Sequence, residues 1–126
     1  MTSRLLCCFA IFLALNFAAV AAPPESTRLQ QAPAKDHDRT NPLRGDPQAI
    51  AAGGELFRDH CEQCHKADAR GDDRHPSLRT ERLASASDGD LEWFLRQGDL
   101  AHGMPSWAAL PKSQRWQLVA YLRSLQ

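Results

Sequence analysis

The stretch "CEQCHKAD", residues 61–68, places two cysteines three residues apart and follows the second one directly with a histidine. Three chemistries use such a pair of cysteines: a redox-active disulfide, one half of a zinc site, and covalent attachment of haem. The rest of the chain has to distinguish between these three kinds of site.

The N-terminal 21 residues have the composition of a secretory signal peptide. Arg4 precedes an apolar run of 16 residues, "LLCCFAIFLALNFAAV", and Ala19-Val20-Ala21 forms a small-x-small cleavage signal. A spanning helix needs roughly 20 apolar residues, so an uncleaved anchor is the weaker alternative. We therefore predict a signal peptide over residues 1–21, a periplasmic location, and no stable membrane insertion once the signal is removed.

Removal of this signal leaves Cys61 and Cys64 as the cysteines of the mature chain. Two free thiols in an oxidising compartment need an explanation. The whole chain has 15 basic and 15 acidic residues, and they are interspersed rather than grouped in blocks. This pattern does not indicate nucleic-acid binding.

The mature chain divides into a polar N-terminal segment and a helical domain. Residues 22–46 are rich in proline and poor in apolar residues, which predicts a disordered tether. His37 lies there between two aspartates, in what we interpret as a solvated charge cluster. Residues 47–126 show helical periodicity and no strand pattern, which predicts an all-α domain. Its helices are expected over residues 47–61, 87–98 and 111–126.

The middle helix has clear end signals. Ser87 and Asp90 have the spacing of a capping box, and Gly98 is a suitable terminator. Glu92 and Arg96 are four residues apart, so we expect them to form an ion pair on the outer side of this helix.

Covalent haem is the chemistry that fits the cysteine pair best. A thioredoxin-like disulfide needs a preceding strand, and a structural zinc needs four ligands. Cys61 and Cys64 lie one helical turn apart, so each can form a thioether with a haem vinyl group. His65 can then bind the iron. One covalently bound haem c would also supply the large apolar group that three helices with long loops otherwise lack.

The second axial ligand decides what such a haem does. A methionine ligand favours electron transfer, whereas an open position favours binding of small ligands. Met104, in "HGMPSWAAL", is the one methionine of the mature chain. We therefore predict Met104 as the sixth ligand of the iron, with His102 as the weaker candidate.

With these residues placed, the chain resembles the class I cytochrome c family, of the bacterial periplasmic type. The resemblance covers residues 47–126 and rests on "GGELFRDHCEQCH", "HPSL", "HGMP" and "LVAYL". In that family the first and last helices cross at a glycine and an aromatic residue. Gly53, Phe57 and Tyr121 match these positions, so the resemblance implies that they pack the two helices together.

The resemblance also implies a support shell around the haem. Pro76 would offer its backbone carbonyl to the free nitrogen of His65 and so fix the tautomer of that ligand. Leu78 would line the haem pocket. Trp107 would pack near the haem edge or bond a propionate, while Trp93 and Trp116 follow helical patterns and are expected in the core.

These features predict an electron carrier with a single His/Met-ligated haem rather than an enzyme. The alternative is a haem-based sensor or small peroxidase-like enzyme with an open or labile sixth site, for which His102 and Arg96 are the nearby distal candidates.

The "GMPSW" loop is similar to that of periplasmic cytochromes that serve quinoprotein dehydrogenases. The implied partners are therefore redox proteins, either a dehydrogenase or an oxidase, and the chain could be the cytochrome subunit of a dehydrogenase. Its sparse lysines do not favour an oxidase of the mitochondrial kind.

Overall fold

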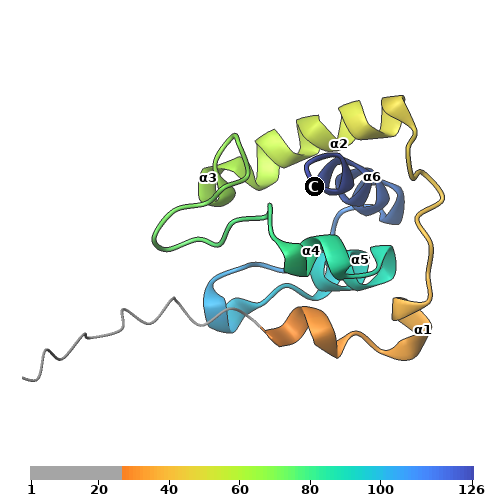
Figure 1. Ribbon diagram of the computed structural model, residues 1–126, viewed down its shortest axis with the longest axis horizontal. Helices are drawn as coiled ribbons and strands as arrows, with labels where there is room; N and C mark the ends of the chain where they lie inside the picture. The colour runs from red at the N-terminus through yellow and green to blue at the C-terminus, as the bar shows by residue number, and fades with distance from the viewer. Residues whose placement is uncertain (1–26) are drawn as a thin grey trace, which may run out of the picture.

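The computed structural model describes residues 27–126 of the chain, which fold into short helices joined by long loops (Figure 1). Within these residues there is no β-strand, and only one isolated bridge, between Asp99 and Met104, has strand-like pairing. The predicted all-α fold class is confirmed. The elements are η1 (Thr27–Gln31), α1 (Ala34–His37), α2 (Pro47–His60), α3 (Glu62–His65), α4 (Glu81–Ser85), α5 (Asp88–Gln97), η2 (Leu100–His102) and α6 (Lys112–Ser124).

The crossing of α2 and α6 is the main helix contact of the fold (Figure 1). A Cβ atom added at Gly53 would lie 2.1 Å from the carbonyl oxygen of Gln117, so only glycine allows this close approach. The ring centroids of Phe57 and Tyr121 lie 5.3 Å apart beside it. The contacts that the resemblance implied for Gly53, Phe57 and Tyr121 are therefore present.

Helix α5 has the predicted ends. The hydroxyl of Ser87 accepts the backbone N–H of Asp90, and the carboxylate of Asp90 accepts the backbone N–H of Ser87, at 3.0 and 2.8 Å. Gly98 ends the helix with φ +66°, a backbone conformation that favours glycine. Helix α6 is two residues shorter at its C-terminus than predicted and begins just after Pro111.

The tryptophans that were expected in the core differ in burial. Trp116 is buried in the core cluster on α6. Trp93 is half-buried on α5, and the guanidinium of Arg28 lies 6.0 Å from the centroid of its ring. The core prediction therefore holds for Trp116 and only in part for Trp93.

The prediction of a disordered tether over residues 22–46 is wrong for residues 27–46, which we call the N-terminal strap. The strap forms η1 and α1, passes along α5 and then runs to the start of α2 (Figure 1). Leu29, Asp36 and Asn41 are buried in it. The segment has too few apolar residues to fold by apolar burial alone, but polar contacts to α5 and α6 hold it in place. The remainder of the predicted tether and the predicted signal peptide lie outside the described residues.

No helix within residues 27–126 combines the length and the apolar content needed to cross a membrane.

Candidate haem-binding site

The cysteine motif lies where α2 ends and α3 begins. The backbone N–H groups of Cys64 and His65 donate to the carbonyl of Cys61, at 3.1 and 2.9 Å, and so close one helical turn. All three side chains are half-buried, and both cysteines are free thiols. The turn thus gathers the two predicted attachment residues and the predicted iron ligand within one short segment.

The electrostatics of the motif disfavour thiol redox chemistry at Cys61. Burial, and next the nearby Cys64 thiol, raise the pKa of Cys61 to about 11. Redox-active cysteines need a lowered pKa, because the thiolate is the reacting species. Burial also lowers the pKa of His65, which keeps its imidazole neutral and able to bind a metal.

The predicted contact between His65 and Pro76 is present. Nδ1 of His65 lies 3.0 Å from the carbonyl oxygen of Pro76, and because a carbonyl can only accept, Nδ1 carries the proton. This hydrogen bond leaves Nε2 as the nitrogen available to a metal. Leu78, two residues further on, is half-buried against the core, and its N–H donates to the carbonyl of Ala69 at 2.8 Å.

A compact loop over residues 66–75 supports this contact. The carboxylate of Asp72 accepts from Lys66 Nζ at 2.8 Å and from the ring of His75 at 2.9 Å. It also accepts the backbone N–H of Arg74, and these contacts, led by that of Lys66, hold its pKa well below the usual range. This cluster was not predicted from the sequence, although Asp72 follows Gly71 at a turn where an aspartate often accepts local N–H groups.

Met104 lies in a narrow loop between α5 and α6. Its backbone exchanges two hydrogen bonds with Asp99, of 2.8 and 3.0 Å, which closes the loop at its base. The side chain of Met104 is half-buried and packs against the core cluster. His102, the competing candidate, is exposed and its ring is bound to the Asp99 carboxylate at 2.9 Å.

The segment after Met104 is fixed to both α5 and the cysteine motif. The Ser106 hydroxyl donates to the backbone carbonyl of Arg96 at 2.7 Å, and the backbone N–H of Trp107 donates to the backbone carbonyl of Leu95 at 2.9 Å. The rings of Trp107 and His60 lie 5.1 Å apart between centroids. Because His60 directly precedes Cys61, this contact brings the methionine loop to the same side of the molecule as the cysteine motif.

The residues present fit a covalently bound haem better than a zinc ion. Two free thiols on one turn can each form a thioether bond. His65 is neutral, and its hydrogen bond to Pro76 uses Nδ1 and not Nε2. Across residues 27–126, His, Cys, Asp and Glu side chains form no group of three or more that could hold a metal ion. The structure therefore gives the zinc hypothesis no ligand set.

Comparison with known proteins agrees with this assignment. Residues 48–122 match the family model described as "Cytochrome C oxidase, cbb3-type, subunit III". The chain is similar to the cbb3-type cytochrome c oxidase subunit CcoP of Rubrivivax gelatinosus, with 44% identity over 61 residues. That match covers 46% of this chain and 20% of CcoP, so the chain spans only a fifth of that relative.

A solved structure gives the same picture. Cytochrome cL from the marine methylotrophic bacterium Methylophaga aminisulfidivorans superposes with a TM-score of 0.59 and 28% identity, over 68% of this chain and 58% of that one. Because the family model covers more than half of the chain, the resemblance seen in the sequence is confirmed. The chain belongs to the class I c-type cytochromes, in the family of the cbb3-type oxidase subunit III, and membership of that family implies covalently bound haem c and a role in electron transport.

Proposed function

We propose that the protein is a periplasmic electron carrier that holds one haem c through Cys61 and Cys64, with His65 and Met104 as the axial iron ligands. When bound, the haem supplies one iron that alternates between the ferric and ferrous states. The residues of the chain hold it, exclude water and fix the ligands. Pro76 fixes His65 through the 3.0 Å hydrogen bond to Nδ1, the observation that best supports this proposal.

The distal side of the site favours a carrier over a sensor or peroxidase-like enzyme. An enzyme of that kind needs a histidine or arginine free to act over an open iron position. His102 is bound to Asp99, and Arg96 donates to Asp36 at 3.0 Å. Both distal candidates are therefore bound to carboxylates. Met104, in the same loop as His102, carries a soft thioether sulfur that is suitable as an iron ligand.

The partners we propose are redox proteins. The likeness to CcoP points to electron delivery toward an oxidase of the cbb3 type, whereas the sequence alone pointed to a quinoprotein dehydrogenase as donor. Mixing the reduced protein with a purified cbb3 oxidase would measure electron transfer from the protein. Mixing the oxidised protein with a quinoprotein dehydrogenase would measure electron transfer to it. Fast oxidation in the first mixture would support the oxidase as electron acceptor, and fast reduction in the second would support the dehydrogenase as electron donor.

Substitution of the two distal candidates tests the ligand assignment. In haem-loaded protein, Met104→Ala should remove the ferric methionine–iron charge-transfer band, lower the reduction potential and allow carbon monoxide to bind the ferrous form. His102→Ala, the matched control from the same loop, should leave all three unchanged. The reverse pattern would identify His102 as the ligand and end the His/Met proposal.

A further inference from the structure

A buried carboxylate joins the N-terminal strap to the region that carries Met104. The side chain of Glu92, on α5, is 1% exposed. Its Oε2 accepts from Arg39 Nη1 of the strap at 3.0 Å, and its Oε1 accepts from Arg115 Nε of α6 at 2.8 Å. One carboxylate thus bridges two arginines that come from opposite ends of the described chain.

From Arg115 the connection continues into the methionine loop. Nη1 of Arg115 donates to the backbone carbonyl of Ala108 at 3.3 Å and to that of Leu110. These carbonyls lie four and six residues after Met104. The Arg115 side chain is itself only 8% exposed, so Glu92 is the charge that holds its guanidinium in this orientation.

A second connection runs through Asp36 of the strap. Its carboxylate, 8% exposed, accepts from Arg39 Nη1 and from Arg96 Nη2, each at 3.0 Å. The backbone carbonyl of Arg96 accepts the Ser106 hydroxyl, two residues after Met104. The strap therefore contacts the supports of the methionine loop at two points.

We propose that the N-terminal strap is a positioning element for the distal iron ligand, acting through Arg39, Glu92 and Arg115. This inference rests on the proposed function, in which Met104 binds the iron. Buried charges that bind the same partner are strongly coupled. Removal of one cation therefore changes the contacts of the remaining charges. Loss of Arg39 would leave Glu92 with fewer donors, so that Arg115 turns toward the carboxylate and releases the loop carbonyls.

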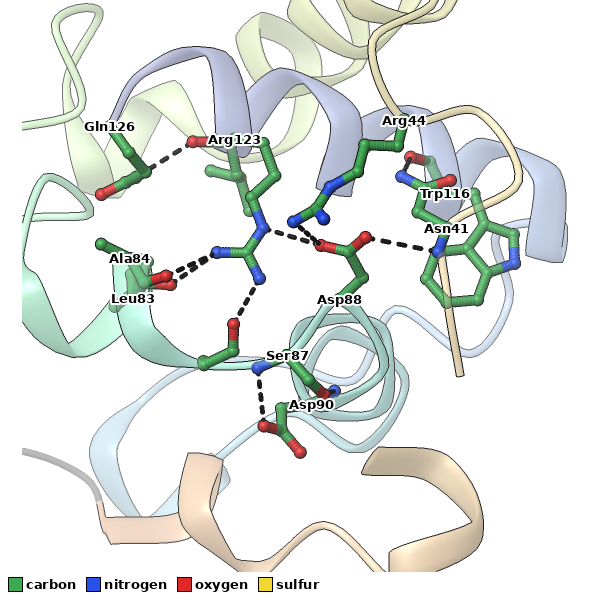
Figure 2. A network of polar contacts seen from close by, with 12 residues as sticks. Asn41, Arg44, Leu83, Ala84, Ser87, Asp88, Asp90, Trp116, Arg123 and Gln126 are labelled. Carbon is green, nitrogen blue, oxygen red and sulfur yellow. Dashed lines mark hydrogen bonds and ion pairs between the residues drawn. The ribbon is translucent and has the colours of Figure 1, made fainter. Parts of the chain in front are cut away.

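The same strap provides a matched control. Arg44 donates to Asp88, another buried carboxylate of α5, at 3.3 Å (Figure 2). Asp88 also accepts from Arg123 Nε at 2.7 Å, and Arg123 in turn donates to the carbonyls of Leu83, Ala84 and Ala86. This Asp88 network leads to α4 rather than to the methionine loop, so loss of Arg44 should weaken the strap without affecting Met104.

The test compares Arg39→Gln with Arg44→Gln in the full-length, haem-loaded protein. Ferric protein is titrated with imidazole, which competes with the methionine sulfur for the iron. We expect Arg39→Gln to bind imidazole about tenfold more tightly than wild type, because a charged hydrogen bond that holds the loop is lost. Arg44→Gln should stay within about twofold of wild type, because the Asp88 network leads to α4 rather than to the methionine loop.

Each outcome decides the question. Equal imidazole affinities for the two variants would mean that the strap is only structural, and would overturn the inference while leaving His/Met ligation intact. A wild-type protein without the ferric methionine–iron band would remove the proposed ligation and this inference together. If Arg39→Gln does not fold with haem, Asp36→Asn, which removes the carboxylate charge that Arg39 and Arg96 share, should show the same tighter binding of imidazole.

Discussion

The loop beside His65 and the N-terminal strap are both held by charged side chains, but over very different distances along the chain. In the loop, Asp72 binds His75 three residues away, and the hydrogen bond from His65 to Pro76 spans eleven. In the strap, Arg39 reaches Glu92 across 53 residues. The loop is therefore specified by its own neighbouring residues, whereas the strap exists only once the tertiary structure has formed.

The two regions also differ in their exposure to solvent. The Asp72 side chain is 35% exposed, while that of Glu92 is 1% exposed. Water and salt screen the ion pairs of the loop, so each contributes little to stability. The ion pairs that Arg39 of the strap forms with Asp36 and Glu92 are largely buried and depend on each other, so removal of one member should be costly.

Loss of Glu92 should lower the stability of the protein more than any of the other substitutions proposed below. Glu92→Ala would leave Arg39, Arg96 and Arg115 without their shared carboxylate. We expect the free energy of unfolding to fall by about 3–5 kcal/mol, the usual result of breaking a buried pair. Unfolding in guanidinium chloride, monitored by circular dichroism, measures this free energy.

The control for this prediction is an exposed carboxylate. Glu55, 63% exposed and paired with Arg58 on α2, can be replaced by alanine. This change should alter the free energy of unfolding by no more than about 0.5 kcal/mol. Equal losses for the two variants would mean that burial does not determine the cost of losing a paired carboxylate.

The α2–α6 crossing supports both regions, since α2 leads into Cys61 and α6 carries Arg115. Gly53→Ala would drive a methyl group into the Gln117 carbonyl. We expect it to lower the free energy of unfolding by about 2–3 kcal/mol, the upper range for overpacking. Gly54→Ala should stay within about 1 kcal/mol of wild type, because its Cβ would meet only the Tyr121 ring, at 3.3 Å, and alanine favours the helix. A tolerated Gly53→Ala would contradict the packing described here.

The sequence was sufficient for the features that depend on neighbouring residues. The capping box at Ser87 and the end of α5 at Gly98 were both predicted, because each has a local signature. The α2–α6 contact at Gly53 was implied by the family resemblance. The cysteine motif gave the family correctly, and the contact between Pro76 and His65 followed from the resemblance.

The features that were missed depend on partners far away in the sequence. Glu92 and Arg96 were expected on the outer side of α5, because their spacing resembles a solvated pair. In the structure Glu92 is fully buried, since Arg39 and Arg115 approach it from other elements. The strap was predicted to be disordered for the same reason: no composition measure detects a charge whose partner lies 53 residues away.

Asp72→Asn should disturb the loop and leave the strap unchanged. The lowered pKa of Asp72 means that its carboxylate stabilises the fold above its ordinary value of 3.8, an effect lost as the pH falls through the lower folded value. The variant should therefore be less stable than wild type at neutral pH, and the two should converge in strong acid. Amide exchange should quicken at Ala69 and Gly71 but not at Asn41. Faster exchange at Asn41 would show that the regions are not independent.

His37 gives the smallest expected effect, on the strap side. Its pKa is raised above 6.5, first by the hydrogen bond to Asp90 and then by the charge of that carboxylate, with a smaller effect from Asp38. This stabilisation is complete below about pH 6.5 and is lost as the pH rises through the raised value. His37→Gln should lower the unfolding temperature at pH 5, and the difference should shrink by pH 9. A difference that grows with pH would contradict the assigned ion pair.

The ligation of the iron by His65 and Met104 is the central claim, and the optical spectrum of the haem-loaded protein tests it most directly. The protein is matured with haem and recorded in the oxidised state, in the reduced state, and in the reduced state with carbon monoxide. We predict a low-spin spectrum, a ferric methionine–iron charge-transfer band and no change with carbon monoxide. A high-spin spectrum that shifts with carbon monoxide would contradict the claim and establish an open sixth position.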